Sequence, residues 1–456
     1  LFSCFQRLKK SMGQRTNAAV IGAGAAGLVC ARELARQNIE VTIFEKSSQV
    51  GGVWVYEPEV DDDITGVDPT STVHSSLYDS LRTNLPRDLM AFSDYYFDST
   101  GGGEDTWPRY PHHSKVLEYL ERFAVDHDLT KTMRLGATVT RLKPSLEERG
   151  DDANRRPKWL VESEDAEGNF SREAFDAVAV CNGHYSKPRV PILPGMESFP
   201  GYVIHSHNYR RPDEFKNMKV AVWGTAASGA DIAREIASVA TEVYWCGNAF
   251  ELPTRSGGQG IDLYPSPVSC SGSRIIFNDQ VSLDGVDAFV YCTGYEFNFP
   301  FLEKNIVSVE DNWVHPLYLD LVSTRFENLA FIGLPYLVIP FRLFEMQSRW
   351  FASGIAGEMR MPNQQEMMHA YEASRQKLIK KDVPKHHYHR LGDAQTDYIN
   401  LLAKQCGADT VPEWYMGLAL EAQKARIADP EGFRARPLKF QGPTVVLRED
   451  QLPEVQ

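Results

Sequence analysis

A glycine-rich turn near the beginning of the chain carries its most informative chemistry. The turn is Gly22-Ala23-Gly24-Ala25-Ala26-Gly27, which has G-x-G-x-x-G spacing. In such a turn the first glycine permits a sharp bend, the second lets the backbone approach a pyrophosphate, and the third lets a helix pack closely on a strand. A strand-like run over residues 17–21 precedes the turn, and apolar residues at helical spacing follow it. We therefore predict that this turn binds a dinucleotide, and a tight turn without a ligand is the alternative.

An acidic residue stands where a dinucleotide site needs one. Glu45, followed by Lys46, closes a second strand-like run over residues 41–44. It lies about 20 residues beyond the turn, the offset typical of a carboxylate that accepts hydrogen bonds from ribose hydroxyls. We expect Glu45 and Lys46 to lie in the same dinucleotide site.

A second glycine-rich turn occurs about two hundred residues later. It is Gly224-Thr225-Ala226-Ala227-Ser228-Gly229, and it follows a strand-like run over residues 219–223 and opens a helical pattern. Alanine replaces the middle glycine, so the methyl group of Ala226 should hold a pyrophosphate slightly farther from the backbone. Ser228 can supply a hydroxyl to a phosphate. We predict a second dinucleotide site, with a plain strand-to-helix turn as the alternative.

Length, charge and cysteine usage limit the class of protein. A chain of 456 residues with 43% hydrophobic content suits two domains. The net charge of -13 argues against a nucleic-acid-binding surface. Seven scattered cysteines without a C-x-x-C pair argue against a dithiol reductase and indicate reduced thiols in a cytoplasmic protein.

Other familiar catalytic patterns are missing from the sequence. It has no G-x-S-x-G elbow, no P-loop and no obvious acid–base pair. His386, His387 and His389 have no neighbouring cysteine or acidic cluster, so we expect no metal site. His112 and His113 precede a helical pattern over residues 114–125, for which Ser114 is the expected N-cap.

The sequence also bears on membranes. The longest apolar run, residues 329–341, is interrupted by Pro335 and Pro340, whereas a spanning helix needs about 20 apolar residues. We expect this run to be core. The C-terminal tail is polar, so we expect no membrane anchor, and residues 1–16 form an N-terminal extension.

Further motifs connect the chain to a known family. The motif Phe199-x-Gly201-x-x-x-His205-x-x-x-Tyr209 lies between the two turns. Four further motifs are relevant to the same comparison: Gly51-Gly52-Val53-Trp54, Thr83-Asn84-Leu85-Pro86-Arg87, Cys181-Asn182-Gly183-His184-Tyr185 and Cys292-Thr293-Gly294-Tyr295. Over residues 17–405 the chain resembles the flavin-containing monooxygenases of class B. The related Baeyer–Villiger enzymes carry Trp where this chain has Tyr209. Residues 81–87, 204–209 and 389–393 most resemble plant S-oxygenases of the glucosinolate type.

The resemblance implies an α/β fold with two Rossmann-like dinucleotide-binding domains, the smaller NADPH domain being inserted into the larger FAD domain. The expected divisions are residues 17–202 for the first part of the FAD domain, 203–292 for the NADPH domain, and 293–456 for the rest of the FAD domain with the C-terminal region.

The resemblance also implies the reaction. In this family NADPH reduces FAD, the flavin traps O2 as a C4a-hydroperoxide, and a sulfur or nitrogen nucleophile takes the distal oxygen. The expected substrate is a small thioether, either an S-alkyl or S-alkenyl cysteine derivative or a methylthioalkyl glucosinolate, which becomes a sulfoxide. The alternatives are N-oxygenation of an amine, an NADPH oxidase that releases H2O2, and a non-catalytic flavin scaffold.

The resemblance assigns roles to individual residues. Asn84 matches the family's asparagine near the flavin and the nicotinamide, and an asparagine that caps a turn is its alternative. Val53 and Trp54 should pack at the flavin, and Thr293 and Gly294 should contact cofactor.

One departure concerns nucleotide choice. Relatives often place an arginine near the position of Asn248 to pair with the 2'-phosphate of NADPH, and this chain does not. Arg234, Arg255 and Arg274 are the candidate substitutes, and we expect NADPH to be preferred.

Overall fold

The larger of two main sheets has seven strands. The computed structural model describes residues 15–60, 63, 65–68, 73–97, 107–145, 156–255, 260–278 and 281–438. Five strands of the larger sheet are parallel and two at one edge are antiparallel. In spatial order they are β19 (Leu317–Tyr318), β20 (Val322–Ser323), β21 (Leu329–Phe331), β7 (Ala177–Val180), β1 (Asn17–Ile21), β2 (Glu40–Glu45) and β3 (Met133–Leu135).

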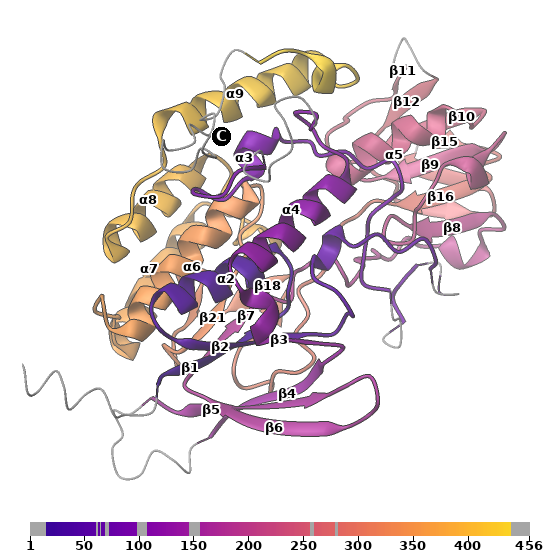
Figure 1. Cartoon of the computed structure of the whole chain (residues 1–456). Helices are drawn as coiled ribbons and strands as arrows, with labels where there is room; N and C mark the ends of the chain where they lie inside the picture. The colour runs from indigo at the N-terminus through magenta and orange to yellow at the C-terminus, as the bar shows by residue number, and fades with distance from the viewer. Residues whose placement is uncertain are drawn as a thin grey trace, which may run out of the picture.

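Side-chain alternation along these strands buries both faces of the larger sheet. Ala18 and Val20 point into a core with the helices, whereas Ala19 and Ile21 point into a second core. The helices on the first face are α2 (Ala25–Arg36), α4 (His113–Asp126), α6 (Pro340–Ala356) and α8 (Gln395–Cys406) (Figure 1). The second face is covered by an antiparallel sheet of β4 (Thr138–Ser145), β5 (Lys158–Glu164) and β6 (Phe170–Phe175).

The smaller main sheet has six strands, and all but β11 are parallel to their neighbours. Their spatial order is β11 (Thr254–Arg255), β12 (Ile261–Tyr264), β10 (Glu242–Cys246), β9 (Lys219–Trp223), β16 (Ala288–Tyr291) and β8 (Tyr202–His205). Helix α5 (Ala227–Ala237) packs on one face. The hairpin strands β13 (Ser269–Ser271), β14 (Arg274–Asn278) and β15 (Val281–Leu283) pack on the other.

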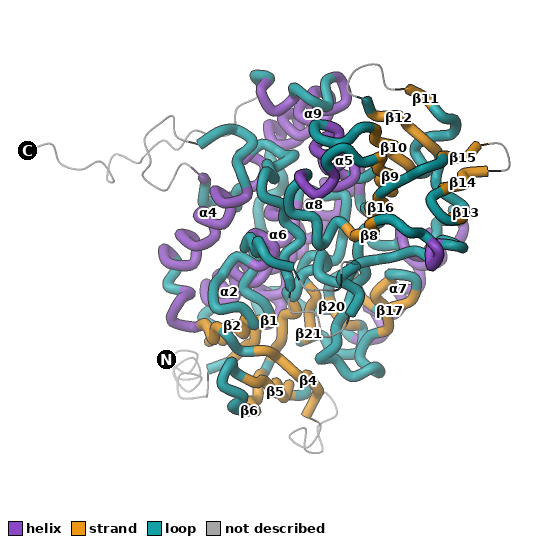
Figure 2. The backbone as a smooth tube through the Cα atoms, turned by 90° about the vertical axis from the view of Figure 1, so that its right-hand side faces the viewer, coloured by secondary structure: helices purple, strands orange, loops and turns teal. Residues whose placement is uncertain are grey.

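The chain leaves the larger sheet, builds the smaller one and then returns. Strands β19, β20 and β21 come after β16 in sequence, yet β21 pairs with β7. In Figure 2 the larger sheet lies in the lower part of the molecule and the smaller sheet lies above it, toward the upper right. This order confirms the α/β fold with a smaller dinucleotide-binding domain inserted into a larger one.

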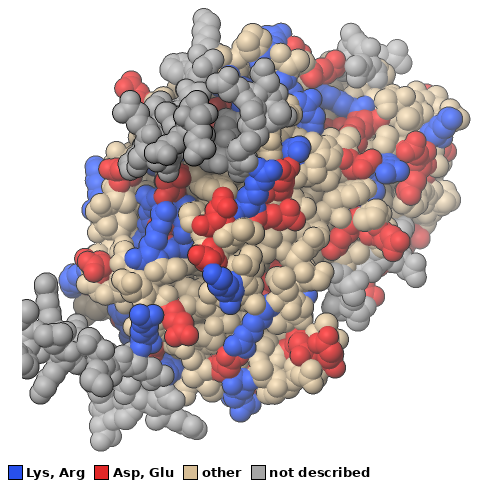
Figure 3. Space-filling view, in the orientation of Figure 1, with Lys and Arg blue, Asp and Glu red and all other residues tan. Residues whose placement is uncertain are grey.

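The remaining elements complete the outer layers. They are β17 (Ser308–Glu310), β18 (Trp313–His315), α3 (Arg87–Met90), α7 (Gln364–Lys380) and α9 (Glu413–Ala428), with short 3-10 turns η2 (Gly52–Trp54), η4 (Leu129–Thr132), η6 (Met196–Ser198), η7 (Asp213–Phe215), η8 (Lys385–His387), η9 (Gly392–Ala394) and η10 (Phe433–Ala435). On the face seen in Figure 3, acidic and basic side chains are interspersed.

Several sequence expectations can be compared with these elements. The apolar run 329–341 forms β21, a loop and the start of α6, and it is mostly buried, although Leu337 is 57% exposed. Within the described ranges, every helix is too short or too polar to span a bilayer. The six cysteines in those ranges are free thiols. Residues 1–14 of the expected N-terminal extension lie outside the described residues.

The N-cap of α4 differs from the expectation. The helix begins at His113, and the ring of His112, not the hydroxyl of Ser114, caps it. The Nδ1 atom of His112 accepts from the Ser114 N–H at 3.3 Å. An imidazole nitrogen replaces the hydroxyl oxygen that the sequence favoured, so the prediction that Ser114 is the cap was wrong.

Candidate active site

The first glycine-rich turn joins β1 to α2, and the surrounding main chain requires two of its glycines. Gly22 has φ of +106°, and a Cβ there would lie 2.5 Å from the carbonyl oxygen of Cys181. A Cβ on Gly27 would lie 1.8 Å from the carbonyl oxygen of Gly22. Because main-chain atoms cannot move aside as a flexible side chain can, no other residue fits at either position.

Gly24 lies against a second pair of glycines. The Gly51 N–H donates to the carbonyl of Ala23 at 3.0 Å. A Cβ on Gly52 would lie 2.9 Å from the Cα of Gly24, and a Cβ on Gly24 would lie 3.5 Å from the Cα of Gly52. Because Gly24, Gly51 and Gly52 have no side chains, only main-chain atoms meet here at the beginning of α2.

This bare helix N-terminus fits a pyrophosphate. No side chain of the described residues caps α2, and its first turn carries no acidic residue. The first N–H groups of a helix have no partner within the helix, and they attract anions. Residues Ala25 and Ala26 add only methyl groups there.

Glu45 closes β2 beside the turn, and its side chain is buried. One carboxylate oxygen accepts from the Ala23 N–H at 2.7 Å, and the other accepts from the Ser47 N–H at 2.8 Å. Each oxygen keeps a further lone pair, so the carboxylate can also accept from a ribose hydroxyl. The brace that Glu45 provides to the turn was not foreseen from the sequence. Burial lowers the pKa of the neighbouring Lys46 against the attraction of Glu45 and Glu57.

The second glycine-rich turn joins β9 to α5 with the same backbone. Gly224 has φ of +135°, and a Cβ there would lie 2.1 Å from the carbonyl oxygen of Cys292. A Cβ on Gly229 would lie 1.9 Å from the carbonyl oxygen of Gly224. No side chain of the described residues caps α5, so its first N–H groups can also meet an anion. Thr225, Ala226, Ala227 and Ser228 line this end of the helix.

The chain returns from the smaller sheet toward the larger one at residues 293–294, next to the second turn. Thr293 follows Cys292, and its hydroxyl donates to the carbonyl of Arg189. Gly294 has φ of +86° and open space where a Cβ would be. The Arg189 N–H donates back to the carbonyl of Gly294 at 2.9 Å. The segment 293–294 is thereby held with an open face.

The motif from Phe199 to Tyr209 packs and links these parts. His205 is fully buried, and its Nδ1 accepts from the His207 N–H at 3.0 Å. Burial lowers the pKa of His205 to about 3, with the nearby His207 as a second cause. The Tyr209 hydroxyl donates to Glu235 of α5 at 2.8 Å. His205 and Tyr209 therefore make packing and linking contacts within this segment.

Asn84 lies in a loop that precedes α3. Its side chain is half-buried and makes no hydrogen bond to another residue within the described ranges. The neighbouring Thr83 donates its N–H to the carbonyl of Pro111 at 2.9 Å and its hydroxyl to the carbonyl of Leu85 at 2.8 Å. Thr83, not Asn84, therefore stabilises the turn. A role for the Asn84 amide in binding a ligand stays a prediction.

Val53 and Trp54 form η2 directly after the two glycines that face Gly24. Trp54 is half-buried against the core of the larger domain. The structure therefore brings Val53 and Trp54 to the first turn.

Comparison with known proteins identifies the family. The model of the flavin-binding monooxygenase-like family matches residues 15–258 and 248–410, which together span most of the chain. The chain belongs to this family. It is an NADPH-dependent flavin monooxygenase with FAD as its flavin, and the expected cofactors are confirmed.

The flavin monooxygenase is similar to plant enzymes over most of its length. It is 43% identical over 409 residues to the Arabidopsis thaliana flavin-containing monooxygenase FMO GS-OX5, covering 87% of this chain and 86% of that one. It is 38% identical to the S-allyl-L-cysteine S-oxygenase of Allium sativum, with a TM-score of 0.87 and coverage of 93% and 95%. Tmm from Pelagibacter sp., at 23% identity and a TM-score of 0.79, shares the fold, with coverage of 94% and 95%.

The candidate arginines for the 2'-phosphate have different surroundings in this monooxygenase. Arg234 donates to the carbonyl of Ala230 at 3.0 Å and lies 5.9 Å from the ring of Trp245 on β10. Arg274 pairs with Asp284 on the β14–β15 hairpin. The side chain of Arg255 lies outside the described residues. The structure therefore leaves Arg234 as the described candidate beside β10, and its role stays a prediction.

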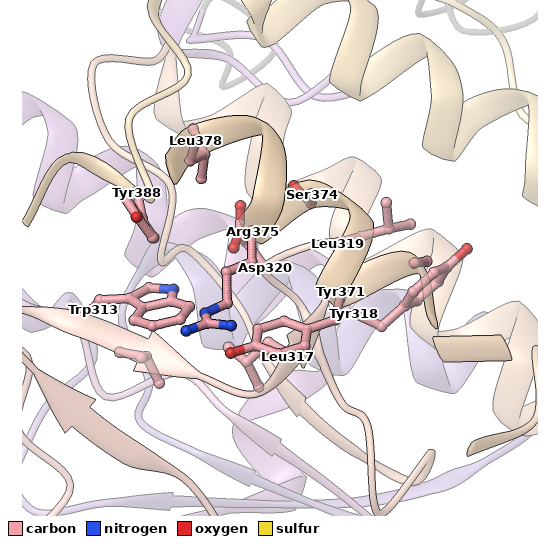
Figure 4. A pocket seen from close by; sticks show the side chains of 12 residues that line it. Trp313, Leu317, Tyr318, Leu319, Asp320, Tyr371, Ser374, Arg375, Leu378 and Tyr388 are labelled. Carbon is pink, nitrogen blue, oxygen red and sulfur yellow. The ribbon is translucent and has the colours of Figure 1, made fainter. Parts of the chain in front are cut away.

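A separate cavity of about 80 Å³ lies between α7 and the edge formed by β18 and β19 (Figure 4). Trp313, Tyr371 and Arg375 line it. It includes none of the residues predicted to bind cofactor.

The nearby histidines do not converge on a common point. His389 accepts from the Val314 N–H at 2.9 Å through Nε2 and lies 3.1 Å from Asp320 through Nδ1. His386 pairs with Asp311, and His387 lies at the hydroxyl of Tyr336.

Proposed function

We propose that the protein transfers one atom of O2 to the sulfur of a small thioether and so forms a sulfoxide. NADPH supplies two electrons, and the second oxygen atom leaves as water. The proposed substrates are S-alkyl or S-alkenyl cysteine derivatives and methylthioalkyl glucosinolates. The observation that carries this proposal is the similarity to the Allium sativum S-allyl-L-cysteine S-oxygenase over nearly all of both chains.

The first turn is the proposed seat of FAD. Residues Gly22, Gly24 and Gly27 shape the bend at α2, and Ala23, Ala25 and Ala26 leave its N-terminus accessible to a pyrophosphate. Glu45 would accept from the ribose, with Lys46 beside it, and Val53 and Trp54 would pack against the flavin. Bound FAD, once it is reduced, would provide the group that reacts with O2.

The second turn is the proposed seat of NADPH. Gly224 and Gly229 shape it, and Thr225, Ala226, Ala227 and Ser228 face the phosphates. Thr293 and Gly294 would contact cofactor at the crossing. We further propose that the domains divide at residues 17–202, 203–292 and 293–456.

Asn84 is the proposed catalytic residue. Its amide would donate a hydrogen bond at the reacting edge of the flavin and the nicotinamide. The support is its half-buried side chain, which makes no hydrogen bond to other residues in the described ranges. The protein's other task is to exclude water, because water at this place would release peroxide.

Product stoichiometry tests the proposal. The purified holoenzyme is mixed with NADPH in air, and NADPH consumed, H2O2 released and sulfoxide formed are measured with S-allyl-L-cysteine, with a methylthioalkyl glucosinolate and with trimethylamine. We expect close to one sulfoxide per NADPH with at least one thioether.

Other outcomes would replace the proposal. Release of one H2O2 per NADPH, unchanged by any added thioether, would make the protein an NADPH oxidase. Turnover of the amine without turnover of the thioethers would make it an N-oxygenase. An absence of NADPH oxidation under all conditions would favour a non-catalytic flavin scaffold.

A further inference from the structure

An arginine near the end of the described chain contacts the loop that carries Asn84. Arg434 belongs to η10 and is mostly buried, with 18% of its side chain exposed. Its Nε donates to the carbonyl of Thr83 at 3.1 Å, and one Nη donates to the carbonyl of Arg82 at 3.3 Å. These carbonyls come directly before Asn84 in the chain. Arg434 therefore fixes the main chain on which the Asn84 side chain is mounted.

The same guanidinium also reaches the NADPH domain. The Nη that contacts the Arg82 carbonyl donates to Asp231 of α5 at 2.9 Å. Hydrogen bonds of this charge-assisted kind are among the stronger ones in proteins. Asp231 is four residues before Glu235 on α5, so both carboxylates lie on one face of that helix.

Two tyrosines and a serine strengthen this contact between the loop and α5. The Tyr78 hydroxyl donates to Asp231 at 3.2 Å, and the Ser80 hydroxyl donates to Glu235. The Tyr209 hydroxyl donates to the other oxygen of Glu235. Burial raises the pKa values of Tyr78 and Tyr209, with help from these carboxylates, so both phenols stay protonated donors.

The C-terminal segment that holds Arg434 is itself anchored. The preceding Phe433 is 2% exposed and packs edge-on against Tyr110 at 5.3 Å. The carbonyl of Leu438 accepts from Arg109 at 3.3 Å, and the carbonyl of Arg109 accepts from the Arg87 N–H at 2.8 Å. The segment is therefore seated beside both ends of the Asn84 loop.

We propose that Arg434 is a positioning residue that couples the Asn84 loop to the NADPH-binding helix α5. When the nicotinamide nucleotide is bound at the start of α5, Arg434 keeps the Asn84 loop at a fixed position relative to that helix and to the nucleotide. This inference rests on the function proposed above, because it takes Asn84 as the catalytic residue. A planar fork is needed, since one side chain must meet two carbonyls and one carboxylate together.

Variants of the flavin-loaded full chain test this coupling. R434Q removes the positive charge, R434K keeps the charge without the planar fork, and D231N removes the negative charge of the acceptor on α5. R436Q is the matched control, because Arg436 lies two residues away, is half exposed and, among the described residues, pairs with Asp429. The measurements are FAD content, melting temperature, the NADPH concentration that half-saturates anaerobic flavin reduction, and H2O2 released per NADPH with S-allyl-L-cysteine.

We expect R434Q and D231N to keep FAD while the half-saturating NADPH concentration rises about tenfold, the effect of one lost hydrogen bond to a charged group. H2O2 per NADPH should rise in parallel, R434K should fall between R434Q and the wild type, and R436Q should match the wild type.

The proposal is wrong if R434Q and D231N match R436Q in NADPH saturation and in H2O2 release. It is also wrong if their losses follow FAD content or melting temperature alone, which would make the contact purely structural. Anaerobic reduction needs no thioether. A wild type that forms no sulfoxide would therefore remove the proposed S-oxygenation and leave the coupling to be judged by the reduction data.

Discussion

Gly24 and Ala226 occupy equivalent places in the two glycine-rich turns, with φ of -76° and -79°. Both begin a helix, and in both turns the first glycine abuts the carbonyl of a cysteine that follows the neighbouring strand. Their surroundings differ. Gly24 is covered by Gly51 and Gly52, whereas Ala226 and Ala227 are exposed. The same backbone therefore forms one enclosed site and one open site.

This difference is the one expected if the first turn binds FAD and the second binds NADPH, as proposed. A flavin that stays with the enzyme needs an enclosed binding site, and a nicotinamide nucleotide that must leave after each turnover needs an open one. The alanine is tolerated at residue 226 because its φ suits any residue and its side chain is exposed.

Gly24→Val should have the largest effect and would sharpen the contrast. The valine methyl groups would meet Gly52, whose Cα already lies 3.5 Å from an ideal Cβ on Gly24. We expect the purified variant to lose nearly all of its FAD, measured as flavin absorbance per chain. A yellow, fully loaded variant would refute the enclosed site.

Asn84→Ala should have the next largest effect and tests the loop that is proposed to meet both cofactors. FAD content should stay the same, because the amide makes no hydrogen bond to other residues in the described ranges. Sulfoxide formed per NADPH should fall roughly tenfold, the effect of one lost hydrogen bond to a charged group. Unchanged product yield per NADPH would remove Asn84 from the mechanism.

Ala226→Val is the counterpart of Gly24→Val in the open turn. We expect normal FAD content and a rise of about fivefold in the half-saturating NADPH concentration, for a steric cost near 1 kcal/mol. Flavin loss equal to that of Gly24→Val would show that the two turns are not specialised. Ala226→Gly serves as the matched control.

The last effect is absent at neutral pH and appears only in acid, and it concerns His205, which lies at the end of β8 in the smaller sheet. Its pKa is lowered to about 3, so below its ordinary pKa of about 6.5 the unfolded chain takes up a proton that the folded chain refuses. Unfolding free energy should therefore fall by about 1.4 kcal/mol per pH unit through this group as the pH drops from about 6.5 to about 3. His205→Asn keeps an acceptor for the His207 N–H and should flatten that slope, measured by urea unfolding at several pH values. An unchanged slope would contradict the buried neutral state of His205.

The strands and turns that depend on neighbouring residues in the sequence could be predicted from it. Strands 17–21 and 219–223 have the bounds that the sequence indicated, because each is an apolar run that leads directly into a glycine-rich turn. The strand expected over 41–44 extends to 40–45. The glycine spacing likewise indicated both strand–turn–helix units, and the binding of a cofactor at each turn stays a prediction.

Contacts between distant segments were beyond the sequence. No spacing rule relates Gly24 to Gly52, or Arg434 to Arg82 and Asp231, since these residues meet only after the chain has folded. The same holds for the 2'-phosphate, because the surroundings of Arg234 and Arg274 depend on partners elsewhere in the fold.

Hydrogen exchange of the FAD-loaded enzyme tests most directly which turn holds which cofactor. Amide exchange is compared with and without NADP+, by mass spectrometry of peptides that contain residues 22–28 and 224–230. The account predicts slow exchange in the first peptide under both conditions and new protection of the second peptide when NADP+ is added. Protection by NADP+ at residues 22–28, or unchanged exchange at residues 224–230, would contradict it.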